Sequence, residues 1–141
     1  MSIEINYFAV FLAAVSSMVV GSIWYMPAVF GNAWMKLTGV KMNNKLPAKQ
    51  MAIMYGLTFV ASLLTADILA HVAFVDNQFF KHSFMQDTLT MALWLWAGFT
   101  AARFLVHDLF EGRRKKLTLL NSAHELVTVV VMALIIGAMG T

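Results

Sequence analysis

Residues 117–139 read LTLLNSAHELVTVVVMALIIGAM, an apolar run broken only by a short polar stretch near its start. A helix rises about 1.5 Å per residue, so a run of this length reaches across a hydrocarbon core about 30 Å thick. Three other runs are also rich in Leu, Ala, Val, Met and Phe and contain no proline. They cover residues 5–24, 51–74 and 88–106. The sequence therefore predicts four membrane-spanning segments.

The composition of the whole chain supports this interpretation. Of 141 residues, 60% are hydrophobic and 12% are charged, whereas a soluble domain is about 45–50% apolar and about 25% charged. Backbone polar groups in lipid must be satisfied within each segment, and strand-type alternation is absent, so the spans are predicted to be helices. We expect an all-α polytopic four-helix bundle in which residues 1–141 form a single integral membrane domain.

Several classes of chemistry are excluded or disfavoured by what the chain lacks. It contains no cysteine, which excludes thiol nucleophiles, zinc–thiolate sites and redox dithiols. No phosphate-binding glycine loop, nucleophile elbow or dinucleotide fingerprint is present. The 11 methionines are scattered over loops and spans, which favours gap filling over a copper pathway. We therefore expect no cofactor, and an enzyme is the less favoured class.

Basic side chains are concentrated in two of the three connections. The first connection contains four lysines and the third has a basic run at residues 113–116, whereas the second has only Lys81, offset by Asp76 and Asp87. Basic connections stay on the cytoplasmic side, so both termini are predicted to lie outside, with a bacterial inner membrane as the expected location. The first six residues contain no Lys or Arg, unlike a secretory signal, so we expect the first span to be retained.

The first connection begins with an aromatic motif. Residues 21–35 read GSIWYMPAVFGNAWM. The proline is expected to end the first span, and the apolar positions beyond it share one face, as in a short helix lying in the headgroup region. Two interpretations remain open: an aromatic belt followed by a turn, or a gate or lipid-contacting element beside a pore. The motif residues are Trp24, Tyr25, Pro27, Phe30, Gly31 and Trp34.

The pattern G-x-x-W-Y-x-P-x-x-F-G-x-x-W-M over residues 21–35 resembles a family of small bacterial membrane proteins known as domain of unknown function 1761. The run FEGR at residues 110–113 fits the same family in outline. The resemblance implies four spans over essentially the whole chain. Met26 departs from the small polar residue expected at that place. The family supplies no established activity, so the resemblance assigns no catalytic role.

Small residues recur every fourth position along the first span, at Ala9, Ala13, Ser17 and Gly21. Such a stripe makes one face of a helix nearly flat and lets a neighbouring backbone approach closely. We expect tight packing there, against another helix of the same chain or against another copy. A bundle this small has little interior volume, so a homo-oligomer is expected if the protein transports anything.

Polar residues occur inside the third and fourth spans. Ionisable groups there cost free energy, so they are expected to have a partner or a function. Arg103 and Glu125 lie at similar depths if the two spans are antiparallel neighbours. The sequence therefore predicts an Arg103–Glu125 ion pair. The polar residues of the two spans are Thr100, Arg103, His107, Asn121, His124, Glu125 and Thr128.

Three interpretations of this polar group remain open. It is a structural ion pair, a proton- or ion-handling path through His124 and Glu125, or a metal site completed by His107. The metal site is the least favoured, because no His-Glu-x-x-His arrangement is present. Asp67 and His71, one turn apart near the outward end of the second span, are either a local pair or an outer station of a path.

The favoured function is a small homo-oligomeric transporter or channel for protons or small ions. The alternative is a noncatalytic accessory protein whose ion pair specifies assembly and whose interfacial helix contacts a membrane protein partner or lipid. No nucleic-acid partner is expected, because the basic residues lie in membrane loops and no folded basic domain is present.

Overall fold

A computed structural model describes residues 4–41 and 46–141, and all regular structure within these ranges is helical. The all-α fold predicted from the sequence is confirmed. Four helical segments are long and apolar enough to cross a membrane, which identifies a membrane protein. They are Tyr7–Trp24, Ala48–Phe80, Phe84–Phe110 and Lys115–Met139. Each predicted span lies within one of these segments, except that residues 5 and 6 precede the first helix.

The segments contain both α-helices and wider π-helical turns. The first span is α1, and a π-helical turn, η1, connects it to the short helix α2. The third span consists of two α-helices, α4 and α5, joined by a second π-helical turn, η2. The bounds are α1 Tyr7–Trp24, η1 Pro27–Gly31, α2 Asn32–Thr38, α3 Ala48–Phe80, α4 Phe84–Leu95, η2 Trp96–Ala101, α5 Ala102–Phe110 and α6 Lys115–Met139.

Local signals account for several helix ends. The side chain of Asn6 accepts a hydrogen bond from the Ala9 amide at 3.1 Å and caps the start of α1. The side chain of Ser83 accepts a hydrogen bond from the Gln86 amide at 3.3 Å and caps the start of α4. At the end of α2, Gly39 has a φ of 76°, a left-handed conformation that glycine adopts without a steric cost.

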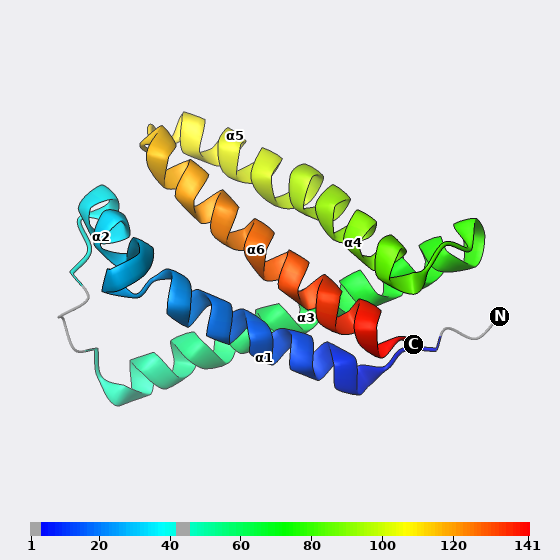
Figure 1. Ribbon diagram of the computed structural model, residues 1–141. Helices are drawn as coiled ribbons and strands as arrows, with labels where there is room; N and C mark the ends of the chain where they lie inside the picture. Colours follow the sequence, from blue (N-terminus) through cyan, green and yellow to red (C-terminus); the bar gives the residue numbers. More distant parts are fainter. Residues whose placement is uncertain (1–3, 42–45) are drawn as a thin grey trace.

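The helices pack so that the bundle has two distinct ends (Figure 1). At one end lie α2 and the turn from α5 to α6; at the other lie the turn from α3 to α4, the start of α1 and the C-terminus. The first end contains both basic connections, and we call it the basic end; the other is the terminal end. Within the bundle, α1 and α4 each pack against α3 and α6.

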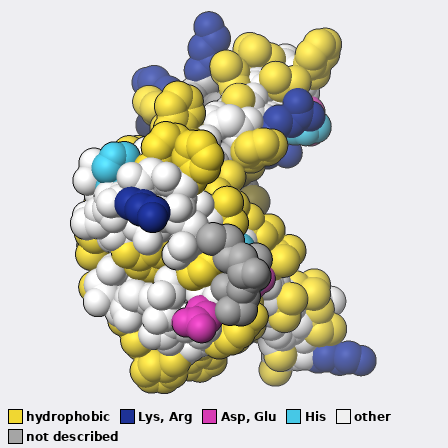
Figure 2. Space-filling view, turned by 90° about the vertical axis from the view of Figure 1, so that its right-hand side faces the viewer, with side chains coloured by type: hydrophobic (Ala, Val, Ile, Leu, Met, Phe, Trp, Pro, Cys, Tyr) yellow, Lys and Arg dark blue, Asp and Glu magenta, His cyan; other side chains and the backbone are white. Residues whose placement is uncertain are grey.

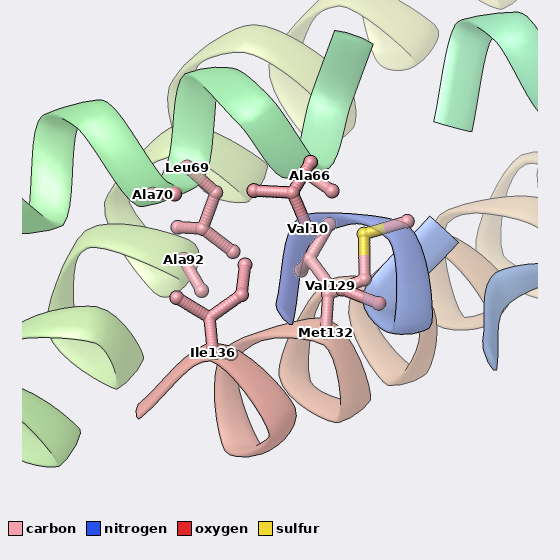
Figure 3. Packing of buried hydrophobic residues seen from close by; sticks show 10 residues of the cluster. Val10, Ala66, Leu69, Ala70, Ala92, Val129, Met132 and Ile136 are labelled. Atoms are coloured by element: carbon pink, nitrogen blue, oxygen red, sulfur yellow. The ribbon is translucent and has the colours of Figure 1, made fainter. Parts of the chain in front are cut away.

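An apolar core fills the place where α1, α3, α4 and α6 meet (Figure 3). Alanines bring the helices close together, and Leu69, Met132 and Ile136, each 2% exposed or less, fill the space between them. The buried members of the core are Val10, Ala13, Ala66, Leu69, Ala70, Ala92, Val129, Met132, Ala133 and Ile136.

The small-residue stripe of α1 packs inside the protomer. Ala9 and Ala13 are fully buried. The Ser17 hydroxyl donates to Ser62 Oγ on α3 at 2.7 Å, and Gly21 faces α6. The partner helices of this stripe therefore belong to the same chain, so the stripe supplies no surface for contact between copies.

Many large apolar side chains are exposed on the outside of the molecule, and Figure 2 shows groups of them on one face. The first turns of α3 are exposed, and α5 contains no buried residue. Helices that expose so much apolar surface are suited to contact with lipid.

Candidate functional site

The turn η1 folds the chain back onto the end of α1. Gly31 lets the chain approach its own backbone closely: a Cβ atom added there would lie 2.2 Å from the carbonyl oxygen of Tyr25 and 2.8 Å from the carbonyl carbon of Met26. The Gly31 amide instead donates to the Met26 carbonyl at 2.9 Å. Only a residue without a side chain fits so close to the backbone, so Gly31 fixes where α2 begins.

Aromatic rings of the motif hold η1 and α2 against α1. The ring centroids of Trp24 and Phe30 are 4.4 Å apart, and those of Tyr25 and Trp34 are 5.7 Å apart with an edge-to-face geometry. Pairs of this kind contribute about 0.5–1.5 kcal/mol beyond the area they bury. Four motif residues thus form one cluster at the basic end.

His124 of α6 packs against this cluster. Its ring centroid lies 5.8 Å from that of Trp24 and 5.0 Å from that of Tyr25. A Cβ atom added to Gly21 would lie 3.5 Å from His124 Nε2, an ordinary contact distance, so α1 approaches the imidazole closely. The structure therefore joins two features that the sequence predicted separately, the aromatic motif and the polar stripe of the fourth span.

Hydrogen bonds connect the members of this site. The Tyr25 hydroxyl donates to Asn121 Oδ1 at 3.2 Å, and His124 Nδ1 lies 3.2 Å from Glu125 Oε1. The Thr128 hydroxyl donates to the His124 carbonyl at 2.9 Å. The His124 side chain is 13% exposed and that of Glu125 is 37% exposed. The imidazole is thus enclosed, while the carboxylate next to it is open on one side.

Tyr25 lies just beyond the end of α1, and its hydroxyl stays protonated. Burial, with the nearby Glu125 carboxylate adding to it, raises the pKa of Tyr25 to about 12. The phenol is therefore a permanent donor to Asn121 at neutral pH.

Comparison with known proteins gives one match. A family model described as "Protein of unknown function (DUF1761)" matches residues 8–137. The chain belongs to the DUF1761 family. The resemblance predicted from the aromatic motif is confirmed, and the match includes both that motif and the His124–Glu125 pair. No curated protein and no solved structure matches the chain.

In this DUF1761 chain, no ion pair joins Arg103 to Glu125 within residues 4–41 and 46–141; the partner of Glu125 there is His124. The predicted pair is not formed, because α5 presents a different face to α6. Ala101, Leu105 and Asp108 line a pocket together with residues of α6, and Arg103 is not among the residues that line it. The wide turn η2 precedes α5 and shifts its phase from that of a regular helix.

The end of α5 has its own charge network. Asp108 accepts a hydrogen bond from the Thr118 hydroxyl and lies 3.7 Å from Arg113, which pairs with Glu111 at 2.6 Å. The His107 side chain is exposed, and no hydrogen bond or ion pair joins it to the described residues; the His107 carbonyl accepts from the Glu111 amide at 2.9 Å. The described ranges also contain no group of three or more His, Cys, Asp or Glu that could hold a metal ion.

Asp67 and His71 form a local pair on α3. His71 Nδ1 lies 2.8 Å from the Asp67 carbonyl oxygen and 3.4 Å from its carboxylate. Both side chains are more than one third exposed. The pair lies on the outer side of α3 at the level of the core, because Ala66, Leu69 and Ala70 of the same helix are core residues.

Sequence reasoning missed a third acid–histidine pair, His82 and Asp87, which closes the turn from α3 to α4. Asp87 is 1% exposed. Its carboxylate accepts a hydrogen bond from Asn77 Nδ2 at 2.7 Å and lies 3.1 Å from His82 Nδ1. A signal was present: Ser83 and Gln86 have the spacing of a capping box, which predicts that a helix begins there and brings the next residue, Asp87, into its first turns.

Proposed function

We propose that this protein is a small membrane transporter or channel for protons or small ions, in which His124 and Glu125 bind and release the proton. The observation that carries the proposal is the 3.2 Å contact between the two side chains. Histidine changes its charge between about pH 5 and 8, whereas an arginine partner would stay charged. Asp, Glu and His side chains form the proton relays of membrane pumps and transporters, and the contact places two such proton-binding groups side by side.

The surroundings of the pair support access from one side. Glu125 is 37% exposed, and the apolar core lies between this site and the terminal end. We propose that protons or ions reach Glu125 from the basic end and that the core is the barrier to be crossed. Asp67 and His71, beside this barrier on α3, are the proposed outer station.

The aromatic cluster is the proposed gate. Trp24 and Tyr25 contact both the imidazole of His124 and the rings of η1 and α2. A displacement of α2 would change the surroundings of His124 directly. Arg103 and His107, exposed on α5, are proposed to face a second copy of the chain, which would complete the path as a homo-oligomer.

An accessory role is the alternative proposal, and one observation favours it. Arg103 lies in a membrane-spanning segment, is exposed, and makes no ion pair with the described residues. Placing an arginine within the hydrocarbon core costs free energy unless its side chain reaches the membrane interface or pairs with a partner. In this alternative, α5 is the surface that contacts a membrane protein partner.

Flux measurements in liposomes test the first proposal. We expect reconstituted native protein to dissipate a pH gradient or a small-ion gradient, and Glu125→Gln to reduce the rate at least about tenfold, because the variant cannot release a proton. Glu111→Gln is the control, since Glu111 pairs with Arg113 outside the spans. If native protein conducts nothing across about pH 5–8 and applied voltage, and a captured partner is lost in Arg103→Gln, the accessory role replaces transport.

We further propose that the basic end faces the cytoplasm of a bacterial cell and that both termini lie outside. The excess of Lys and Arg in the two connections at that end supports this orientation. The chain contains no native cysteine, so single substitutions report topology cleanly. An impermeant thiol reagent should label Phe79→Cys, which is 80% exposed, and should spare Lys116→Cys in intact cells. The opposite pattern would reverse the orientation.

A further inference from the structure

A basic pocket of about 550 Å³ lies at the basic end, between α2 and the start of α6. Its wall on α2 consists of Ala33, Lys36 and Leu37. Its wall on the other side consists of the three consecutive residues Arg114, Lys115 and Lys116. Four cationic side chains and two apolar ones thus line one concave surface.

The four positive charges of this basic pocket are not neutralised by neighbouring acids. Within residues 4–41 and 46–141, none of the four forms an ion pair. The acids of the adjacent turn are engaged elsewhere: Glu111 pairs with Arg113 at 2.6 Å, and Asp108 lies 3.7 Å from the same guanidinium. The pocket therefore attracts an anion.

The walls of the basic pocket are held in place by the aromatic cluster. Trp34 of α2 packs on Tyr25, and the Tyr25 hydroxyl bonds to Asn121 of α6 at 3.2 Å. This connection fixes α2 relative to α6 and so keeps Lys36 opposite the residues of α6. A pocket with a preset shape loses less entropy when a ligand binds.

We propose that the basic pocket binds the headgroup of an anionic phospholipid. The cations would contact the phosphate, and the apolar wall formed by Ala33 and Leu37 would contact the start of the acyl chains. Basic pockets at the ends of membrane helices recognise anionic headgroups in this way. A soluble anion would use the charges but not the apolar wall, so the combination of the two favours lipid. This inference is independent of proton transport.

Native mass spectrometry of the protein in mixed phosphatidylcholine and phosphatidylglycerol tests the proposal. We expect preferential retention of phosphatidylglycerol by the native protein. The combined variant Lys36→Gln, Arg114→Gln and Lys116→Gln should lose most of this preference, at about fivefold per removed charge at low salt. The matched control, Lys41→Gln, Lys49→Gln and Lys81→Gln, removes the same charge outside the pocket and should keep the preference.

Each outcome decides the proposal. An equal loss in the control variant would show general surface attraction and overturn the site. Competition by millimolar inorganic phosphate as effective as that by the lipid would overturn the lipid as the occupant. If the combined variant fails to fold, the single variant Lys36→Gln replaces it in the same measurement, because Lys36 is exposed on α2. An unchanged lipid preference in that folded variant would overturn the proposal.

Discussion

The two acid–histidine pairs at opposite ends of the bundle differ in which partner is buried. At the terminal end the Asp87 side chain is 2% exposed and that of His82 is 52% exposed. Near the basic end the order is reversed: the His124 side chain is 13% exposed and that of Glu125 is 37% exposed. The distances are similar, 3.1 Å and 3.2 Å. Burial, not distance, distinguishes the two pairs.

The comparison separates a structural carboxylate from an accessible one. Both oxygens of Asp87 have partners, because one accepts from Asn77 and the other lies beside His82. Asn77 also donates to the His82 carbonyl at 2.8 Å, so the cluster closes the turn between α3 and α4. Glu125 contacts His124 through one oxygen, Oε1, and its open side can take up a proton or an ion. We infer that Asp87 stabilises the fold, whereas Glu125 serves function.

Replacing each carboxylate with alanine should give the largest difference between the two pairs. Asp87→Ala leaves Asn77 and His82 without their buried acceptor, and we expect a loss of about 3 kcal/mol of folding free energy. Glu125→Ala removes a half-open group, and we expect a loss of about 1 kcal/mol or less. Thermal or denaturant unfolding in detergent measures both. Equal losses would contradict the distinction.

A substitution at Gly31 sharpens the comparison by disturbing only the basic end. In Gly31→Ala the new methyl group meets the Tyr25 carbonyl at 2.2 Å, and we expect overpacking to cost about 2 kcal/mol. The matched control is Gly56→Ala on α3, where nothing lies within 4 Å. That control should be neutral or slightly stabilising, since alanine favours a helix by about 1 kcal/mol over glycine. Chemical shifts of His124 should move in Gly31→Ala, and those of His82 should not.

The hydrogen bond between Ser17 and Ser62 provides a smaller test, because it joins α1 and α3 between the two pairs. We expect a double-mutant cycle of Ser17→Ala and Ser62→Ala to give a coupling free energy of about 0.6 kcal/mol. Ser22→Ala is the control, since the Ser22 hydroxyl donates to the Met18 carbonyl of its own helix. A coupling of zero would mean that the contact between α1 and α3 depends on packing alone.

The smallest expected effect concerns Arg103. It does not pair with Glu125 within the described residues, so Arg103→Gln and Glu125→Gln should act independently, with a coupling within about 0.5 kcal/mol of zero. The charge swap Arg103→Glu with Glu125→Arg should rescue neither single defect. A substantial coupling free energy would mean that Arg103 and Glu125 form the ion pair predicted from the sequence. Glu125 would then not be the partner of His124.

The helices were predictable from local sequence, and the residues that the site brings together were not. Runs of apolar residues determine the four long helices, and Pro27 correctly indicated where α1 ends. The predicted match of Arg103 with Glu125 assumed a regular helix through residues 96–101, where the structure has a π-helical turn. Sequence periodicity carries no signal for this change of phase.

The contact between the aromatic motif and His124 was missed for a different reason. Trp24 and His124 belong to two separate features of the sequence, and the sequence does not specify which helices are neighbours. Both residues lie toward the basic end of antiparallel helices, where Trp24 is the last residue of α1. Counted from the basic ends of the predicted spans, Trp24 is the last residue of its span and His124 lies about 10 Å deeper in its own, so depth alone does not predict their contact. Asp87 was overlooked because it lies outside the predicted spans and was interpreted as a charge offsetting Lys81.

The central claim is that Glu125 exchanges a proton together with His124, and infrared spectroscopy in bilayers tests it most directly. The difference between spectra of native protein and of Glu125→Gln isolates the carbonyl band of the protonated Glu125 carboxyl. We expect this band to respond to pH in the native protein, and the response to change in His124→Gln but not in His82→Gln. A Glu125 band that ignores pH, or that is unaffected by His124→Gln, would contradict the account.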